Sequence, residues 1–170
     1  MPEAGGDGRE LTQGYQLGKY TLLERIGRGG EAVVWSAWDQ LHRRVAALKI
    51  SAGEPGRPAG PFPPGLEQQI HLIASLNHPR ILPLYEFGQA DSFFYIAMRY
   101  SSAGSLALRL LQGRPSLPAA LGYAAQVADA LQYLHGRQVV HRDLKPSNIL
   151  LDSQERLYLS DFGISRQLFE

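Results

Sequence analysis

Short runs of alternating hydrophobic and polar residues fill the chain between residues 20 and 98. Such runs, rich in β-branched and aromatic side chains and bounded by turn residues, are typical of strands in an antiparallel sheet. The connections at residues 39–44 and 88–92 are short and polar, which predicts hairpins there. We therefore expect five strands, at residues 20–26, 33–38, 45–50, 81–87 and 93–98.

One helix is predicted to interrupt this sheet. Leu66, Ile70, Ile73 and Leu76 recur at helical spacing. The run stops before His78-Pro79, where the proline disfavours helix in its predecessor. We expect the inward face of this helix to carry these four apolar residues.

A second helix is predicted over residues 118–135. Ser116 is placed to cap it, Pro118 suits its first turn, and Gly136 is expected to end it. A hairpin of residues 149–151 and 157–159 is expected to follow. The residues expected on one face of this helix are Leu121, Ala124, Val127, Leu131 and Leu134.

These elements predict an α+β fold with a linker in its first part. Residues 51–65 hold five Pro and four Gly, which favours a semi-rigid spacer over a proline-rich docking segment. We expect a flexible tail at residues 1–14, a sheet domain at 15–98 and a second, partly helical domain at 99–170.

Composition excludes several classes of function. The net charge is +1, with 17 basic and 16 acidic residues scattered along the chain, so no nucleic-acid partner is expected. No Cys is present, which removes disulfides and the usual zinc frameworks. No apolar run approaches the length of a membrane span, and we expect a soluble, cytoplasmic protein.

The strongest chemical signal lies after the second helix. It is the run His141-Arg142-Asp143-Leu144-Lys145-Pro146-Ser147-Asn148, followed by Asp161-Phe162-Gly163. Asp143 can accept a hydroxyl proton, and Lys145 can neutralise charge on a transferring phosphate. Asn148 and Asp161 offer the hard oxygen ligands that Mg²⁺ prefers. The alternative interpretation, two polar turns between strands, does not account for so many specified positions.

These motifs resemble the catalytic loop and the metal-binding loop of eukaryotic-type protein kinases, in their bacterial style. Lys145-Pro146-Ser147 is similar to the Ser/Thr branch of that family. The resemblance implies a kinase-like fold, with an N-terminal five-stranded antiparallel sheet and one helix, followed by the first part of a helical C-terminal lobe. It also implies ATP and Mg²⁺ as cofactors, Asp143, Lys145 and Lys49 as catalytic residues, and a protein Ser/Thr hydroxyl as acceptor.

A glycine-rich turn between the first two strands is the second part of the resemblance. The segment runs from Ile26 through Gly27 and Gly29 to Val34, and the chain continues after the turn as the strand Val33-Val34-Trp35. This disfavours a dinucleotide-binding motif, because that motif opens a helix. Without its context, the turn could be an ordinary hairpin, Lys49 a solvated strand lysine and Met98 a core residue. The nucleotide-binding residues that the resemblance implies are Ile26, Gly27, Gly29, Val34, Ala47, Lys49, Met98, Arg99, Ser101 and Leu150.

The sequence departs from the kinase pattern at two places. The helix position that usually holds a Glu partner for the lysine is Gln69 here, while Glu67 points almost oppositely. A neutral Gln69–Lys49 hydrogen bond of about 1 kcal/mol would replace a charge-assisted one of about 1.5 to 3 kcal/mol. In addition, few residues follow Gly163, whereas kinases continue through an activation segment, a peptide-docking surface and further helices.

The second departure leads us to expect a truncated gene product or a fragment of a longer protein. Apolar surface on the second helix, and the turn that holds His141, would then be uncovered, with self-association or partner binding as the consequence. Two alternatives to a protein kinase remain: a nucleotide-binding, pseudokinase-like module without transfer activity, and a small-molecule kinase of related fold. The protein substrate is not readable from the sequence.

Overall fold

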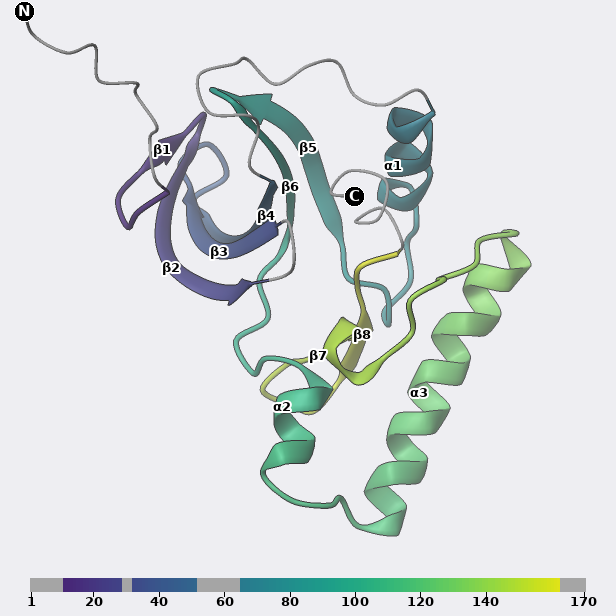
Figure 1. Cartoon of the computed structure of the whole chain (residues 1–170). Helices are drawn as coiled ribbons and strands as arrows, with labels where there is room; N and C mark the ends of the chain where they lie inside the picture. Colours follow the sequence, from purple (N-terminus) through teal and green to yellow (C-terminus); the bar gives the residue numbers. More distant parts are fainter. Residues whose placement is uncertain (1–10, 29–31, 52–64, 163–170) are drawn as a thin grey trace, which may run out of the picture. The chain divides into compact units, whose positions relative to one another are not determined.

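The computed structural model describes residues 11–28, 32–51 and 65–162, with the elements labelled in Figure 1. The chain divides into two compact units. The described parts of residues 1–64 and residues 84–100 form the first unit, and residues 65–83 and 101–162 belong to the second. The strands are β1 Gln16–Leu17, β2 Tyr20–Arg28, β3 Ala32–Asp39, β4 Arg44–Ser51, β5 Leu84–Ala90, β6 Phe93–Arg99, β7 Ile149–Leu151 and β8 Leu157–Leu159. The helices are α1 Leu66–Ala74, α2 Leu106–Leu111 and α3 Leu117–Gly136, with a 3₁₀ turn at Pro146–Asn148.

The first unit is a six-stranded antiparallel sheet in the order β1-β2-β3-β4-β6-β5. Side chains alternate between the two faces of each strand, and one face of this sheet holds the hydrophobic core. The sheet has one strand more than the sequence predicts, because the two-residue β1 pairs with β2 and buries Leu17. The core residues are Leu17, Tyr20, Leu22, Trp35, Ala37, Ala46, Leu48, Ile50 and Ala97.

The connection between β3 and β4 is held by a buried carboxylate. Asp39 is fully buried and accepts hydrogen bonds from the backbone N–H groups of Leu41 and His42, at 3.1 and 3.0 Å. Its second oxygen lies 2.8 Å from Nδ1 of His42. Burial alone would raise the pKa of Asp39, but these hydrogen bonds outweigh it and lower the pKa. The predicted hairpin at residues 39–44 is therefore present, with Asp39 as its organising residue.

The predicted strand at residues 81–87 lies three residues too early, because β5 begins at Leu84. Pro83 has no N–H to donate to a ladder, so the sheet strand starts only after it. The residues before Pro83 pair with β8 of the second unit instead. Leu82 N–H donates to the Leu159 carbonyl at 2.9 Å, and Leu159 N–H donates to the Arg80 carbonyl at 2.8 Å.

In the second unit, α1 follows the predicted pattern at the residues whose side chains are described. Ile70, Ile73 and Leu76 are buried, as expected from their spacing. Gln69 is half-buried on this helix and Glu67 is exposed. The predicted spacer falls largely on residues 52–64, outside the described residues. Residues 65–83 group with the second unit, whereas the sequence predicts them in the first domain. The predicted domain boundaries stay a prediction.

Helix α3 begins where the sequence predicts. The Ser116 hydroxyl accepts a hydrogen bond from Ala119 N–H at 3.4 Å, and a proline stands in the first turn. Gly136 is the last helical residue, but the left-handed position after the helix belongs to Gln138, with φ 59°. An expected glycine C-cap is therefore replaced by a glutamine two residues later.

Leu121, on the apolar face that the sequence predicts for α3, is 62% exposed. The buried residues of the helix are Tyr123, Ala130 and Leu134. Leu121 precedes Tyr123 by two residues, about 200° around a helix, and so lies on the opposite side. Apolar residues surround most of this helix, so their spacing indicates its inward face only weakly.

Candidate functional site

The predicted nucleotide residues of the first unit share one face of its sheet. Directly paired residues in an antiparallel sheet point to the same side. The register pairs Gly27 with Val34, Val34 with Lys49, and Ala47 with Met98. Their neighbours Trp35, Ala46, Leu48 and Ala97 belong to the core on the opposite face. The strand register thus gathers Gly27, Val34, Ala47, Lys49 and Met98 opposite the hydrophobic core.

Three further predicted nucleotide residues differ in how they are placed. Ile26, near the end of β2, is 43% exposed, and it does not belong to the hydrophobic core of the sheet. Arg99 pairs with Ala46, so its side chain lies on the other face from Met98, and only its backbone suits the predicted role. Gly29 lies outside the described residues.

In the second unit, the catalytic-loop residues form a compact polar cluster. The Lys145 ammonium lies 2.8 Å from Oδ2 of Asp143. Nδ2 of Asn148 donates to the same Oδ2 and to the Asp143 carbonyl oxygen, each at 2.9 Å. The 3₁₀ turn Pro146–Asn148 makes this possible, because it folds the chain back within five residues and buries Asn148. The structure therefore brings together the three residues that the motif predicts to act as one group.

His141 is buried, at 2% exposure, whereas Val140 and Leu144 in the same turn are 61 and 45% exposed, as expected of an uncovered turn. Its ring packs against Phe162, with 5.0 Å between the ring centroids. Nδ1 accepts the Asp143 N–H at 3.3 Å, and Nε2 faces the Ser160 carbonyl at 2.8 Å. Burial lowers the pKa of His141, although the Ser160 carbonyl and the charges of Asp143 and Asp161 oppose this. A neutral ring with its proton on Nε2 satisfies both contacts.

Ser160 is a site residue that the motifs did not reveal. Its N–H and its hydroxyl both donate to the Asn148 carbonyl, at 2.9 and 3.1 Å, while its own carbonyl accepts from His141. Ser160 thus ties the segment that ends at Asn148 to the segment that begins at Asp161. Its position directly before Asp161 was the only signal in the sequence.

Asp161 and Asn148 suit a magnesium ion in their chemistry. The two hydrogen bonds from Nδ2 of Asn148 to Asp143 fix the amide so that Oδ1 points away from that residue. Asp161 has φ 59°, a left-handed conformation that Asp tolerates better than most residues. One amide oxygen and one carboxylate are hard ligands, and Mg²⁺ is commonly held by few protein groups together with phosphate oxygens and water. No cluster of three His, Cys, Asp or Glu is found among the described residues.

Leu150 lies on β7, which is held on both sides. Leu150 pairs with Tyr158 of β8. On the other side, Leu151 N–H donates to the Gly104 carbonyl at 2.8 Å, and the Ser101 hydroxyl donates to the Leu151 carbonyl. Ile149 and Leu151 are buried, whereas Leu150 is partly exposed, as alternation along a strand requires.

A side chain from α3 also supports this hairpin. Oε1 of Gln126 accepts the Leu157 N–H at 3.0 Å. Leu157 begins β8, the strand that leads to Ser160 and Asp161. No motif connects residues 126 and 157, so sequence reasoning had no means of finding this contact.

The turn between β7 and β8 is organised by Asp152. Its carboxylate accepts from Gln154 N–H at 2.9 Å, Arg156 N–H at 3.0 Å, Arg156 Nε at 2.7 Å and the Tyr158 hydroxyl at 3.0 Å. Burial acts to raise the pKa of Asp152, but these hydrogen bonds lower it to about 2. The turn is therefore stabilised by the charged form of Asp152.

Asp152→Ala is expected to lower the free energy of unfolding by about 2 to 3 kcal/mol. The reason is that hydrogen bonds to a charged group are lost, and the backbone N–H groups of Gln154 and Arg156 lose the carboxylate that accepts from them. In the unmutated chain, this stabilisation is complete above the unfolded pKa near 4 and is lost as pH falls toward about 2. Urea unfolding between pH 7 and pH 2.5 measures both effects. Glu155→Gln is the matched control: Glu155 forms an exposed pair with Arg109 and should change stability by less than about 1 kcal/mol. Equal losses in the two variants would contradict the assigned role of Asp152.

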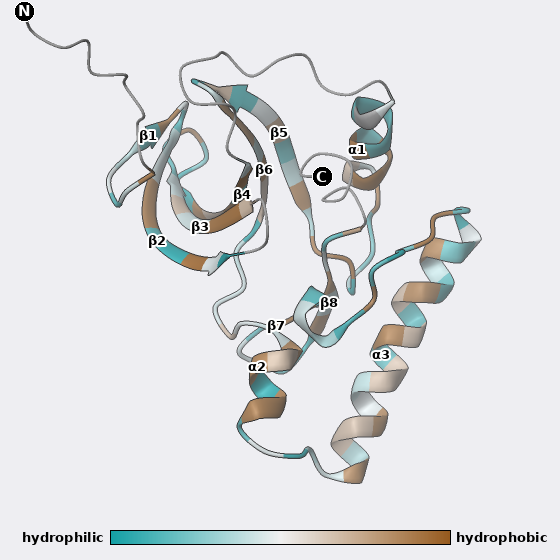
Figure 2. Cartoon of the chain, viewed as in Figure 1, coloured by the Kyte–Doolittle hydropathy of each residue, from teal (hydrophilic) through white to brown (hydrophobic). Residues whose placement is uncertain are grey.

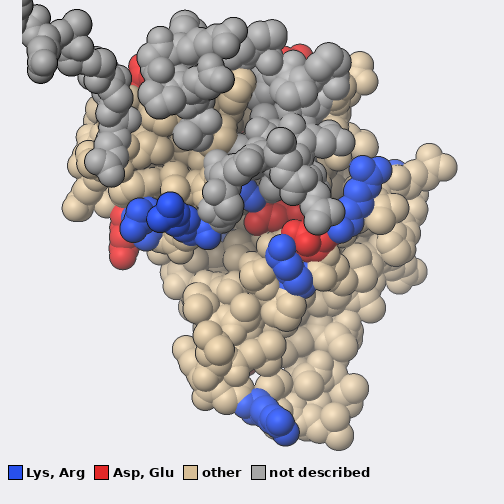
Figure 3. All heavy atoms as spheres, in the orientation of Figure 1, with Lys and Arg blue, Asp and Glu red and all other residues tan. Residues whose placement is uncertain are grey.

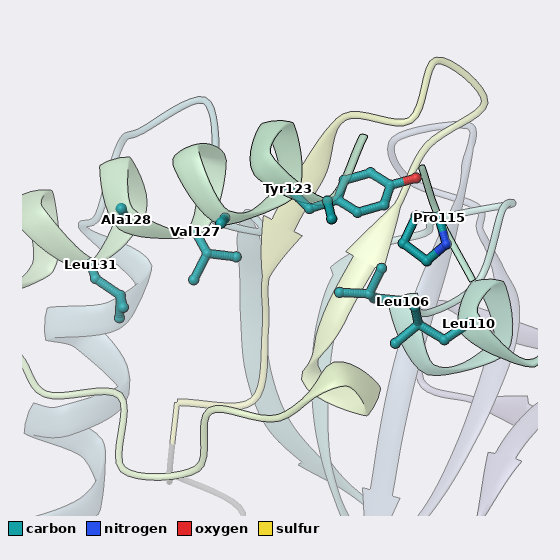
Figure 4. A pocket seen from close by; sticks show the side chains of 9 residues that line it. Leu106, Leu110, Pro115, Tyr123, Val127, Ala128 and Leu131 are labelled. Atoms are coloured by element: carbon teal, nitrogen blue, oxygen red, sulfur yellow. The ribbon is translucent and has the colours of Figure 1, made fainter. Parts of the chain in front are cut away.

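An apolar groove of about 510 Å³ lies between α2 and α3, within the second unit. Figure 4 shows Leu106 and Leu110 of α2 facing the same space as Tyr123, Val127 and Leu131 of α3. Hydrophobic stretches on both helices are visible in Figure 2, and charged side chains are sparse over them on the face shown in Figure 3. Leu111, Leu117 and Leu121 nearby are 84, 73 and 62% exposed. The expectation of exposed apolar surface on the second helix is thus met at Leu121, whereas Leu131 is partly buried.

Within the described ranges, no helix is both long and apolar enough to cross a membrane.

Relatives among characterised proteins include serine/threonine-protein kinases. PknD of Mycobacterium tuberculosis is 37% identical over 154 residues, which are 90% of this chain and 23% of that protein. PknE of Mycobacterium bovis is 34% identical over 157 residues, 92% of this chain and 28% of that protein. PrkC of Bacillus subtilis is 34% identical over 152 residues, 89% of this chain and 23% of that protein. The chain thus spans about a quarter of the length of these relatives.

A solved structure supports the same assignment. The structure of Rad53 1–466 in complex with AMP-PNP matches with a TM-score of 0.74 and 28% identity, over 86% of this chain and 38% of that one. The family model that describes the protein kinase domain matches residues 20–170, which include both the sheet and the catalytic cluster. The chain belongs to the protein kinase domain family.

Proposed function

We propose that this protein is an ATP- and Mg²⁺-dependent serine/threonine protein kinase. The observation that carries the proposal is the cluster of Asp143, Lys145 and Asn148, with contacts of 2.8 and 2.9 Å. It groups a carboxylate that can act as a base, a cation and an amide, and these are types of group that can serve transfer of a phosphoryl group to a hydroxyl. The named kinase relatives support the same reaction.

Each residue of the cluster has a separate role in this proposal. Asp143 accepts the proton of the attacking hydroxyl, and its carboxylate is oriented for this by Asn148. Lys145 lies against that carboxylate and neutralises negative charge on the transferring group. Asn148 and Asp161 hold Mg²⁺, which supplies charge neutralisation for the phosphates when it is bound.

The nucleotide is proposed to bind through the residues that the kinase resemblance implies. Lys49 binds its phosphates, and the backbone of the glycine-rich turn approaches them closely. The adenine is enclosed by small and apolar side chains, while backbone groups of residues 99–101 hydrogen-bond its edge. The proposed nucleotide residues are Ile26, Gly27, Gly29, Val34, Ala47, Lys49, Met98, Arg99, Ser101 and Leu150.

Nucleotide binding is the first test of the proposal. A ligand that binds only the folded state adds RT ln(1 + [L]/Kd) to its stability, so millimolar ATP with Mg²⁺ should raise the melting temperature. The shift should be smaller with EDTA in place of Mg²⁺. A folded sample whose melting temperature does not change at millimolar Mg·ATP would contradict the proposal.

Gln69 provides a further prediction about this function. If it partners Lys49 through a neutral hydrogen bond, Gln69→Glu should strengthen the interaction to a charge-assisted one, a gain of about 1 kcal/mol. The affinity for Mg·ATP should then rise by about fivefold. Glu67→Gln, on the exposed side of α1, is the matched control and should leave the affinity unchanged. The opposite ranking would place residue 67, not 69, against the lysine.

The exposed apolar face of α2 and α3 supports self-association of this chain in solution. Burial of a leucine side chain is worth about 1.5 to 3 kcal/mol, and Leu111 and Leu117 are both largely exposed. The mass measured by light scattering should therefore exceed that of a monomer and fall when both residues are changed to Lys. A monomer at all concentrations would remove self-association from the proposal without affecting the phosphoryl-transfer site.

A further inference from the structure

Gly104 and Ser105 pair with β7 in an antiparallel manner, directly after a turn at residues 102–103. Ser105 and Leu150 form an isolated antiparallel bridge, and Leu151 N–H donates to the Gly104 carbonyl at 2.8 Å. In an antiparallel ladder, the N–H and C=O of one residue point to the same neighbour. The Leu151 carbonyl therefore also faces this segment.

The Ser101 side chain supplies the hydrogen-bond donor that the Leu151 carbonyl needs. The hydroxyl of Ser101 donates to this oxygen, in the place where a backbone N–H would donate in a regular ladder. Leu151 is 2% exposed, so water cannot easily replace the hydroxyl. The contact joins residues that are fifty positions apart.

We propose that Ser101 is a positioning residue of the nucleotide site, acting through its hydroxyl. The hydroxyl holds the backbone of residue 101 against β7 and so fixes it relative to Leu150, which directly precedes Leu151 on that strand. Both are proposed contacts of the adenine, so their separation determines how well the base fits. This inference rests on the proposed function, which assigns the adenine to these residues.

Thr and Val at position 101 have nearly the same shape and differ in one hydroxyl, which makes them a matched pair. Ser101→Thr keeps the donor, and Ser101→Val removes it. Fluorescent N-methylanthraniloyl-ATP with Mg²⁺ should bind the Val variant about three- to tenfold more weakly than the Thr variant, the loss expected for one hydrogen bond. Ser102→Ala, at the exposed neighbouring residue, should bind like the unmutated chain.

A second ligand separates positioning from general stability. Magnesium tripolyphosphate lacks the adenine base. Its affinity, measured by displacement of the fluorescent nucleotide, should therefore be equal in the Thr and Val variants at a temperature where both are folded. In transfer assays, the Val variant should show a larger change in KM for ATP than in kcat.

Equal affinities of the two variants for the fluorescent nucleotide would overturn the inference. It would also be overturned if the Val variant lost as much affinity for tripolyphosphate as for the nucleotide. An unmutated chain that binds no Mg·ATP would instead refute the proposed function, and this inference with it. The two failures are therefore distinguishable.

Discussion

Asp143→Asn is expected to lower phosphoryl transfer by at least about a hundredfold, while Mg·ATP still binds. A positioned base contributes about 10²- to 10⁴-fold to a rate, and an amide cannot accept the hydroxyl proton. The substitution keeps the size of the side chain, and the new amide oxygen can still accept from Nδ2 of Asn148, as Oδ2 does now at 2.9 Å. The loss should therefore appear in kcat. Initial rates of labelled phosphate transfer at saturating ATP measure it.

Asp129→Asn is the matched control for this substitution. Asp129 lies on α3, its side chain is 59% exposed, and it lies 3.5 Å from Nε2 of His78. Surface substitutions of this kind change stability by about 0.5 kcal/mol or less, so transfer should stay within about twofold of the unmutated rate. Comparable rates in the Asp143 and Asp129 variants would show that Asp143 is not the base.

Asp161→Asn is expected to remove most of the magnesium-dependent part of nucleotide binding and to lower transfer by at least about a hundredfold. Metal neutralisation of phosphate charge is worth several kcal/mol, and an amide is a weaker ligand than a carboxylate. Asn tolerates the left-handed backbone of this position, where φ is 59°, so the fold should persist. Titration of Mg²⁺ into a sample with fixed ATP, followed by melting temperature, measures the effect.

The Asp143 variant serves as the comparison for this second experiment. It should keep the magnesium-dependent rise in melting temperature that the Asp161 variant loses. If both variants lost it equally, Asp161 would have no distinct role as a metal ligand.

The sheet was predictable where side chains alternate and each run of residues has one clear partner. β2, β3, β4 and β6 extend by only one or two residues beyond the predicted runs. β1 was not predictable, because two residues carry no periodicity, and it exists through its pairing with β2. β5 was misplaced because Ile81 and Leu82 are buried like strand residues but pair with β8 instead.

Helix α2 shows the limit of hydrophobic periodicity. It spans only six residues, too few for a repeating pattern to emerge. The Ser105 hydroxyl, which accepts from Leu108 N–H at 3.3 Å, was its one local signal. The inward face of α3 was equally hard to infer, because the groove that it forms with α2 involves a helix that the sequence did not reveal.

The candidate site divides in the same way between local and long-range determinants. Asp143, Lys145 and Asn148 lie within one short turn, so the motif itself implied their association. Contacts of Gln126 with Leu157 and of Ser101 with Leu151 join segments 31 and 50 residues apart, and no spacing rule connects them. The partners that hold the site in place therefore became visible only in the folded chain.

Transfer of labelled phosphate from γ-labelled ATP to a generic basic protein, in the presence of Mg²⁺, shows whether this chain is a serine/threonine kinase. We expect label on serine and threonine, dependent on Mg²⁺ and lost in the Asp143→Asn variant. A folded chain that binds Mg·ATP but transfers no phosphate would not be an active kinase, and equal transfer with Asn at position 143 would show that Asp143 is not its base.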